Sequence, residues 1–523
     1  MGRPVLNLDE EMVKKARGLA KEITDEIQKF INVRSTTSVE RTVARFYGID
    51  GVNSQGVPLP NVVVEDVQKK GALDRGITYW LVNACVAKNM TPQEVAEAVG
   101  RGEFSLLDFP PQKESVVAEK IDELTQEALQ RLKNVRDERD RMLQELGDPD
   151  QPYLYVIVAT GNIYEDVIQA KAAVKEGADI IAVIRSTAQS LLDFVPYGPT
   201  TEGYGGTYAT QENFRIMRKA LDEAANEVGR YIRLTNYASG LCMPEISAMA
   251  AIEGLDFLLN DSMYGILFRN INMLRTFVDQ YTSRLICAYS HITINTGEDN
   301  YIKTSDPIER AHTVTTSQLI NEQFALKSHM KPKYMGIGHA FEIDPDVENG
   351  FLYEVAHALL TRELFPHATP KYMPPTRHMT GNIFKGYGMN TLYNLVSIMT
   401  GQSIQLLGML TEAIHTPFLQ DRYLAIENAK YVFNNAKDIG DEIVFKENGF
   451  IQRRANEVLK NAVELLEHVK EVGLISAIEE GTFGDISRKR DEGKGADGVF
   501  PKGEDYYNPI FEMMEEELEE EEI

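Results

Sequence analysis

The sequence has few cysteines, and their positions exclude two kinds of site. Among 523 residues there are three, Cys85, Cys242 and Cys287, which are odd in number and far apart. Such spacing does not suit a zinc site, and it argues against a framework of structural disulfides. We therefore expect a protein of a reducing compartment, the cytoplasm. The N-terminal segment MGRPVLNLDEE lacks the apolar core of a signal peptide, and no apolar run approaches the roughly 18 residues of a membrane span.

Several catalytic and cofactor motifs are also absent. The chain has no Walker motif, no H-E-x-x-H, no C-x-x-C and no G-x-S-x-G. None of its nine histidines lies two residues after an aspartate, so the D-x-H-x-x-G signature of base-off cobalamin domains is missing. The segment GKGADG matches G-x-G-x-x-G, but no strand precedes it and Pro501 follows, so we interpret it as a loop.

An excess of basic residues is absent as well. The net charge of −25 disfavours binding to nucleic acid and to anionic membranes. Part of this charge lies in the terminal segment MEEELEEEEI, which begins at Met514. We expect that segment to be a solvated or frayed helix end.

Residues 1–150 read as a helical N-terminal extension. Apolar residues recur at spacings of three and four from Met12 to Ile31, which predicts an amphipathic helix. A second long helix is predicted over 114–146, because Gly147 and Pro149 follow it as stop signals.

From Tyr153 the pattern changes to alternating strands and helices. YLYVIVATGN and DIIAVIRS flank the helical segment IYEDVIQAKAAVKEG, so these two strands are predicted to be parallel neighbours. Further candidate strands begin at Tyr231, Asp256, Leu285, Tyr334, Lys371 and Ser403. Eight such units predict an α/β fold, a (β/α)₈ TIM barrel over residues 151–420. A doubly wound open sheet is the alternative. Residues 421–523 are expected to form a helical and extended C-terminal accessory segment.

Polar residues follow the carboxyl ends of the predicted strands, where such barrels carry their chemistry. RSTAQS, from Arg185 to Ser190, resembles a phosphate cup, since guanidinium and hydroxyl groups bind phosphate. Its hydroxyls could instead cap a helix, with Arg185 paired to an acid. The other strand ends supply Ser239, Tyr264, Arg269, Glu298 with Asp299, and Glu412.

Each of these other residues also has two interpretations. Tyr264 could stack on a planar cofactor ring or belong to the core. Ser239 could hydrogen-bond a ring nitrogen or cap a helix. The pair Glu298 and Asp299 suits an ammonium group or a metal ion, but equally a helix N-terminus. Glu412 could contribute to a site at the end of the last strand or be a solvated helix residue.

Several long segments carry a family resemblance. They include VIVATGNIYEDVIQA, VIRSTAQSLLDFVPYGPTTEGYGGTYATQENFRIMR, ASGLCMPEI, NDSMYGILFRNINM, INTGEDNY and LLGMLTEAIHTPF. Over nearly the whole chain, the sequence closely resembles the large α subunit of the lysine 5,6-aminomutases. The resemblance implies an isomerase that moves the terminal amino group of D-lysine or L-β-lysine to the neighbouring carbon by radical chemistry.

The same resemblance implies two cofactors and a partner. The barrel would hold pyridoxal 5'-phosphate. A smaller β subunit would carry adenosylcobalamin on a Rossmann-like domain and supply the lysine to which pyridoxal phosphate is attached at rest. The absent D-x-H-x-x-G agrees with this division, and the family suggests an α2β2 assembly. No metal ligands are implied in this chain.

Site residues carry over position by position. The segment Arg185, Ser186, Thr187, Ala188, Gln189 and Ser190 would hold the cofactor, chiefly its phosphate, although Ala188 stands where the family has glycine. Ser239 would meet the pyridine nitrogen, Tyr264 would stack on the ring, and Arg269 would complete the cofactor site. Asp299 would touch the cofactor or the substrate amine. Glu412 would face the adenosyl group.

Three other functions remain open from the sequence. The first is a cobalamin-independent pyridoxal phosphate enzyme, such as a racemase, which needs its own cofactor lysine; Lys385 in GNIFKGYG is the candidate. The second is a scaffold subunit without catalytic residues. The third is an ornithine-type aminomutase, whose large subunit normally includes the cobalamin domain that this sequence lacks.

Overall fold

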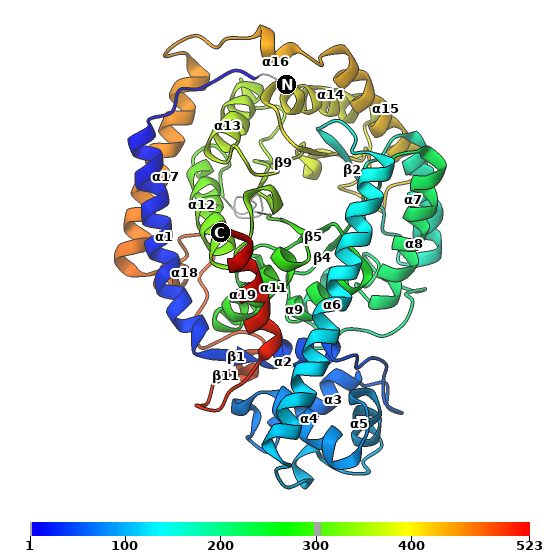
Figure 1. Ribbon diagram of the computed structural model, residues 1–523. Helices are drawn as coiled ribbons and strands as arrows, with labels where there is room; N and C mark the ends of the chain where they lie inside the picture. Colours follow the sequence, from blue (N-terminus) through cyan, green and yellow to red (C-terminus); the bar gives the residue numbers. More distant parts are fainter. Residues whose placement is uncertain (1–2, 298–304, 523) are drawn as a thin grey trace.

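The computed structural model describes residues 3–297 and 305–522 of the chain (Figure 1). Within these residues, eight parallel strand positions close into a barrel. They are β2 (Tyr153–Ile157), β3 (Ile180–Ala182), β4 (Arg233–Tyr237), β5 (Phe257–Leu259), β6 (Thr293–Asn295), β7 (Met335–Gly336) with β8 (Gly338–His339), β9 (Lys371–Tyr372) and β10 (Ile404–Leu406). This confirms the predicted TIM barrel.

One barrel strand is interrupted. β7 pairs with β6 and β8 pairs with β9, so β7 and β8 are two halves of a single strand on either side of Ile337. β10 pairs with β2 and closes the ring. β2 (YLYVI) and β3 (IIA) are apolar on successive residues because both of their faces are buried.

Helices surround the barrel, and each follows a strand. They are α7 (Ile163–Glu176), α8 (Gln211–Val228), α9 (Met243–Glu253), α10 (Tyr264–Arg269) with α11 (Met273–Tyr289), α12 (Ala311–Lys327), α13 (Gly350–Leu364), α14 (Ile383–Thr400) and α15 (Leu419–Asn435). Local signals fix their ends. In α7, the Asn162 side chain accepts a hydrogen bond from Tyr164 N, and Gly177 follows the last turn. The strand ends therefore all open onto one face of the barrel.

The N-terminal residues form helices outside the barrel. They are α1 (Glu10–Asn32), α2 (Thr37–Phe46), α3 (Leu59–Gln68), α4 (Ile77–Lys88), α5 (Pro92–Gly100) and α6 (Glu114–Leu146). Figure 1 shows α3, α4 and α5 gathered in a lobe at one end of the molecule, while α1 runs along α17 (Phe450–Val472). α2 packs on α9 and so connects the lobe to the barrel.

The C-terminal residues return to the N-terminal region. After α16 (Ile439–Glu442), α17 and α18 (Leu474–Glu480), strand β11 (Val499–Pro501) pairs antiparallel with β1 (Arg34–Thr36). The last helix, α19 (Pro509–Glu522), packs on α6 and α11. Across the described residues, every helix is too short or too polar to traverse a lipid bilayer.

Two predictions were wrong. The strand predicted from Leu285 begins only at Thr293, because Leu285–Tyr289 is the last turn of α11. That helix is buried on nearly all sides, so its sequence has the continuous apolar run that is typical of a buried strand. The acidic end of the chain is also not simply solvated. Met514 and Leu518 of α19 are buried, and Tyr281 donates a 2.5 Å hydrogen bond to Glu515.

Candidate functional site

A cavity of about 310 Å³ lies at the carboxyl ends of the barrel strands. This volume falls within the roughly 300–1,000 Å³ of small-molecule sites. The predicted residues that line it are Arg185, Thr187, Ser190, Ser239, Tyr264, Arg269 and Glu412. Seven side chains that follow four separate strands, β3, β4, β5 and β10, therefore converge on one site, which residue spacing alone did not establish.

Arg185 is a buried cation without a carboxylate partner among the described residues. It lies three residues after the end of β3 and is 7% exposed. Its guanidinium donates to two main-chain carbonyls, those of Ala238 at 3.4 Å and of Ser239. Burial lowers the pKa of Arg185 to about 10, so the side chain stays charged at neutral pH. A buried charge requires a counter-ion, and here the cavity is the place for an anion.

The RSTAQS segment is held in place by two glycines from neighbouring loops. A Cβ built on Gly240 would lie 2.8 Å from the Cα of Ser190, and one built on Gly206 would lie 2.7 Å from Ser186 N. These close approaches require glycine. Ser190 in turn donates a 2.7 Å hydrogen bond to the carbonyl of Thr187. The segment therefore has a fixed shape.

Three residues of this segment do not line the cavity. Ser186 is buried, and Ala188 is exposed. The Gln189 amide pairs with the main chain of Ala209, donating at 2.8 Å and accepting at 2.7 Å. This pairing fixes the loop behind the segment, so the geometry gives Gln189 a supporting position rather than one in the cavity.

Asp193 anchors the far end of the same loop. It accepts hydrogen bonds from Arg41 of α2 at 2.7 Å and from Arg275 of α11 at 3.0 Å. Although burial opposes its ionisation, the two guanidinium groups hold the pKa of Asp193 below its ordinary value. The N-terminal helices thus contribute to the position of the cavity wall.

Tyr264 and Arg269 stand together on α10. The guanidinium carbon of Arg269 lies 5.0 Å from the centre of the Tyr264 ring, and Arg269 donates to the tyrosine hydroxyl. Arg269 Nε is buried without a hydrogen-bond partner. On the neighbouring strand end, Ser239 Oγ accepts from Asp261 N at 3.2 Å. The site therefore offers a ring face, a hydroxyl and a second cation.

The four remaining predicted residues, Glu412, Glu298, Asp299 and Lys385, differ in position. Glu412 lines the cavity, and its carboxylate accepts a 3.1 Å hydrogen bond from Met409 N. Glu298 and Asp299 lie outside the described residues. Lys385 is partly exposed, forms a 3.2 Å ion pair with Asp346, and does not line the cavity.

Sequence reasoning missed two charged residues of the cavity, Lys371 and Glu342. Lys371 opens β9, and Glu342 follows β8; both are buried and line the cavity. A signal for Lys371 was available, because a lysine within a buried strand is rare unless it is paired or functional. Glu342 lies in the segment FEIDPD, whose acidic residues read as an ordinary loop.

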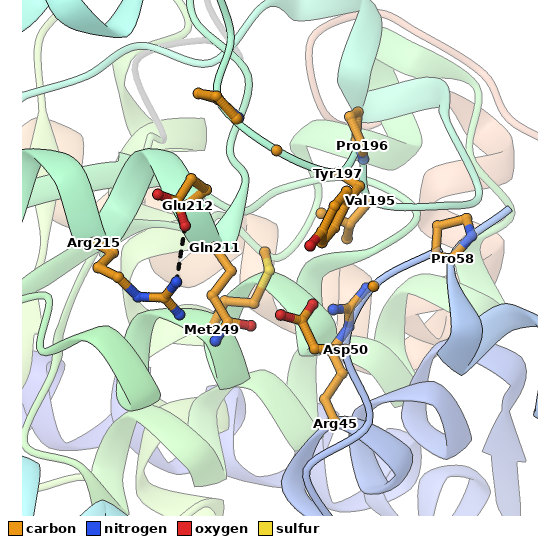
Figure 2. A pocket seen from close by; sticks show the side chains of 13 residues that line it. Arg45, Asp50, Pro58, Val195, Pro196, Tyr197, Gln211, Glu212, Arg215 and Met249 are labelled. Atoms are coloured by element: carbon orange, nitrogen blue, oxygen red, sulfur yellow. Dashed lines mark hydrogen bonds and ion pairs between the residues drawn. The ribbon is translucent and has the colours of Figure 1, made fainter. Parts of the chain in front are cut away.

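A smaller hollow of about 180 Å³ lies outside the barrel, between the N-terminal lobe and α8 (Figure 2). Figure 2 shows Arg45, at the end of α2, and Asp50, in the loop that follows, facing Tyr197 and the start of α8. None of the predicted site residues that the structure describes lines this hollow. The candidate site is therefore the barrel cavity.

Comparison with known proteins finds a family model and two close relatives that carry the same family description. A family model described as the D-lysine 5,6-aminomutase TIM-barrel domain of the alpha subunit matches residues 6–513. The chain is 56% identical over 509 residues to the lysine 5,6-aminomutase alpha subunit of Acetoanaerobium sticklandii, covering 97% of this chain and 98% of that one. It is 55% identical to the corresponding subunit of Fusobacterium nucleatum, with the same coverage.

A more distant relative acts on a different amino acid. The chain is 30% identical over 380 residues to the D-ornithine 4,5-aminomutase subunit beta of Acetoanaerobium sticklandii. This match covers 70% of this chain and 51% of that protein.

Proposed function

The chain belongs to the family of lysine 5,6-aminomutase α subunits, and from this premise we propose how its cavity serves that reaction. An aminomutase is an isomerase, and an α subunit has a partner subunit. We propose that the cavity holds pyridoxal 5'-phosphate and that a smaller β subunit brings adenosylcobalamin in an α2β2 assembly. The substrates would be D-lysine and L-β-lysine, and the enzyme would act in the cytoplasm.

One observation carries the proposal: the buried guanidinium of Arg185 faces the cavity without a carboxylate partner among the described residues. A phosphate monoester fits this site because it supplies the missing negative charge. Thr187 lines the cavity beside it and offers a hydroxyl donor, while the Ser190 hydroxyl, which donates to the Thr187 carbonyl, fixes the turn that carries it. Gly206 and Gly240 pack so closely against the segment that no side chain would fit at either position, and this contact fixes the shape of the segment.

Other residues of the cavity suit the pyridine ring of pyridoxal phosphate and its substituents. Tyr264 offers a ring face for the pyridine, and Ser239 offers a hydroxyl for the ring nitrogen. Arg269 and Lys371 provide further cations for oxygen substituents. When bound, pyridoxal phosphate stabilises an unpaired electron beside the migrating nitrogen, and adenosylcobalamin supplies the radical that starts the reaction. Glu412, at the end of β10, is proposed to orient the group that the partner brings.

The barrel itself contributes geometry and exclusion of water. The site residues come from separate strand ends, so the reacting groups are positioned by rigid elements rather than by one loop. A site at the barrel mouth can be covered by a second subunit, which would protect a radical from solvent. We also propose that the divisions 1–150, 151–420 and 421–523 correspond to helical extension, barrel and accessory segment.

The first test compares cofactor binding in two arginine variants. Arg185→Gln is expected to lower the affinity of the chain for pyridoxal phosphate by about 10- to 100-fold, measured by equilibrium dialysis. Arg215→Gln is the matched control, because Arg215 lies on α8 with Glu212 and Glu253 as ion-pair partners. Equal affinity in both variants would contradict the proposed phosphate position.

The second test separates the aminomutase from the alternatives. Lysine and β-lysine are supplied to the chain alone and to the chain with its β partner, each with and without adenosylcobalamin. Amine migration is expected only with partner and adenosylcobalamin together. Borohydride reduction of the isolated chain with pyridoxal phosphate should attach no cofactor to this chain. Covalent attachment at Lys371 or Lys385 would favour a cobalamin-independent enzyme, and unchanged activity of Arg185→Gln would favour a scaffold.

A further inference from the structure

Glu342 is a buried carboxylate in a position that the binding of the cofactor phosphate does not explain. It lines the cavity, is 2% exposed, and lies three residues after the end of β8. Glutamate is rarely so buried without a specific role or partner. The question is which ligand it receives.

The order of the strands places Glu342 across the barrel from Arg185. Going round the ring from β3, which precedes Arg185, the strands are β4, β5, β6 and then β7 with β8. In the other direction they are β2, β10, β9 and again β8. Because β8 is four strand positions from β3 in either direction around a ring of eight, it lies on the opposite side of the barrel from β3. A ligand with its anionic end at Arg185 therefore presents its far side toward Glu342.

The backbone and neighbours of Glu342 hold its carboxylate in one orientation. Glu342 has φ of 51°, a left-handed conformation that is unfavourable for glutamate. Such conformations persist where surrounding contacts enforce them, and they cluster at functional sites. Thr376 Oγ1 and Arg377 N donate to the two carboxylate oxygens at 3.4 and 3.3 Å, and Arg377 Nη2 donates to the Glu342 carbonyl at 2.6 Å. The Arg377 side chain also forms an ion pair with the carboxylate, with Nε 3.8 Å from Oε2, and so holds it from one side.

The charges of the cavity indicate the ligand. Its described lining has three cations, Arg185, Arg269 and Lys371, and two carboxylates, Glu342 and Glu412. The cations suit the phosphate and the other oxygen atoms of the cofactor and substrate. Lysine and β-lysine each carry a second amine, which does not migrate and is charged at neutral pH. Glu412 follows β10, two strand positions from β3, whereas Glu342 lies opposite β3.

We propose that Glu342 binds the second, non-migrating ammonium group of the substrate and so selects diamino acids over ω-amino acids. This inference rests on the proposed function, because it assumes a lysine substrate in this cavity. It makes Glu342 a substrate-binding residue, with Thr376 and Arg377 as positioning residues.

The test uses a ligand that lacks only the second amine. In the assembled enzyme with its partner and cofactors, dissociation constants are measured for lysine and for 6-aminohexanoate, the latter as a competitive inhibitor. Glu342→Gln is expected to weaken lysine binding by about 10- to 100-fold, as for a lost charged hydrogen bond. It should change 6-aminohexanoate binding by no more than about twofold. Pyridoxal phosphate affinity should stay at the wild-type value.

A matched control is Glu354→Gln. Glu354 is another buried glutamate, on α13, and it bonds to Tyr372 and Tyr393 outside the cavity. This variant should leave the ratio of the two dissociation constants unchanged. If Glu342→Gln does not fold, Glu342→Asp keeps the charge with a shorter reach and should weaken lysine binding alone by several-fold.

The outcomes are distinct. A wild-type assembly that does not rearrange lysine overturns the proposed function, and this inference with it. An active assembly in which Glu342→Gln weakens both ligands equally, or neither, overturns the inference alone.

Discussion

Gly240 controls how closely two loops approach at the cavity. A Cβ at this position would lie 2.8 Å from both the Cα and the carbonyl oxygen of Ser190. We expect Gly240→Ala to displace Ser190, destabilise the fold by about 1–3 kcal/mol and lower pyridoxal phosphate affinity at least tenfold. Thermal unfolding and equilibrium dialysis measure the two effects.

Gly229 offers a control with backbone strain but no neighbour. Its φ is 68°, and a Cβ there would meet nothing within 4 Å. Gly229→Ala should cost about 1 kcal/mol of stability and leave cofactor affinity unchanged. If both variants lost affinity equally, the close contact with Ser190 would not be the reason.

Glu354 makes stability depend on pH. Burial raises its pKa from 4.5 to about 8, although Tyr372 and Tyr393 donate hydrogen bonds to it. The folded protein thus keeps this proton up to about pH 8, whereas the unfolded chain loses it near pH 4.5. The free energy of unfolding therefore falls as pH rises between these values and is level above them.

Glu354→Gln should remove that contribution. Urea unfolding at a series of pH values between about 5 and 9 measures the difference in stability between variant and wild type. We expect the variant to gain relative stability as pH rises toward 8. A difference independent of pH would show that Glu354 is ionised in the folded protein.

Single residues also show where the sequence was and was not informative. Arg185, Ser239 and Tyr264 were predictable because each follows a recognisable strand within a family motif. Lys371 and Glu342 were missed because nothing in the neighbouring residues reveals which side of the barrel a side chain faces. That Gln189 and Ala188 lie outside the cavity could not be predicted either, because it depends on loop contacts such as that of Gln189 with Ala209.

The terminal helix α19 is expected to contribute to stability despite its acidic sequence. Met514 is buried against α6 and α11, while Glu516, two residues later, is exposed. Met514→Ala should destabilise the protein by about 2–4 kcal/mol, because it leaves a cavity in a packed surface. Glu516→Ala should change stability by less than about 0.5 kcal/mol. Equal effects in denaturant unfolding would mean that α19 is not docked in solution.

The two wrong predictions for elements share one physical cause. A helix is identified by its period only when one face is polar. The end of α11 is buried all round, so its sequence LICAY has no helical period. In α19 the charged residues hide the apolar stripe, since Tyr281 and Tyr289 pair with glutamates that the pattern assigns to solvent. The other seven strands were predictable because they alternate with helical segments, and β2 and β3 are also short apolar runs.

The assembled molecule needs a surface for its partner subunit, and exposed apolar side chains follow three barrel strands on one side of the mouth. Tyr204 follows β3, Phe384 begins α14 after β9, and Phe418 precedes α15 after β10. Phe384 is 91% exposed. Because the proposed radical reaction would require a covered mouth, we expect these side chains to contact the β subunit.

Phe384→Asp should therefore weaken α–β association by about tenfold or more, as aromatic residues at interfaces do. Val444, which is 93% exposed and lies between α16 and α17, gives the control Val444→Asp. Sedimentation velocity of each variant with the β subunit measures the dissociation constant, and thermal unfolding of the isolated chain checks that the fold is intact. Weakening by Phe384→Asp alone would place the partner over the cavity, where the proposed adenosylcobalamin would lie near Glu412. Equal weakening by both variants, or by neither, would place the partner on another face, and the proposed adenosylcobalamin would then need a separate motion to reach the cavity.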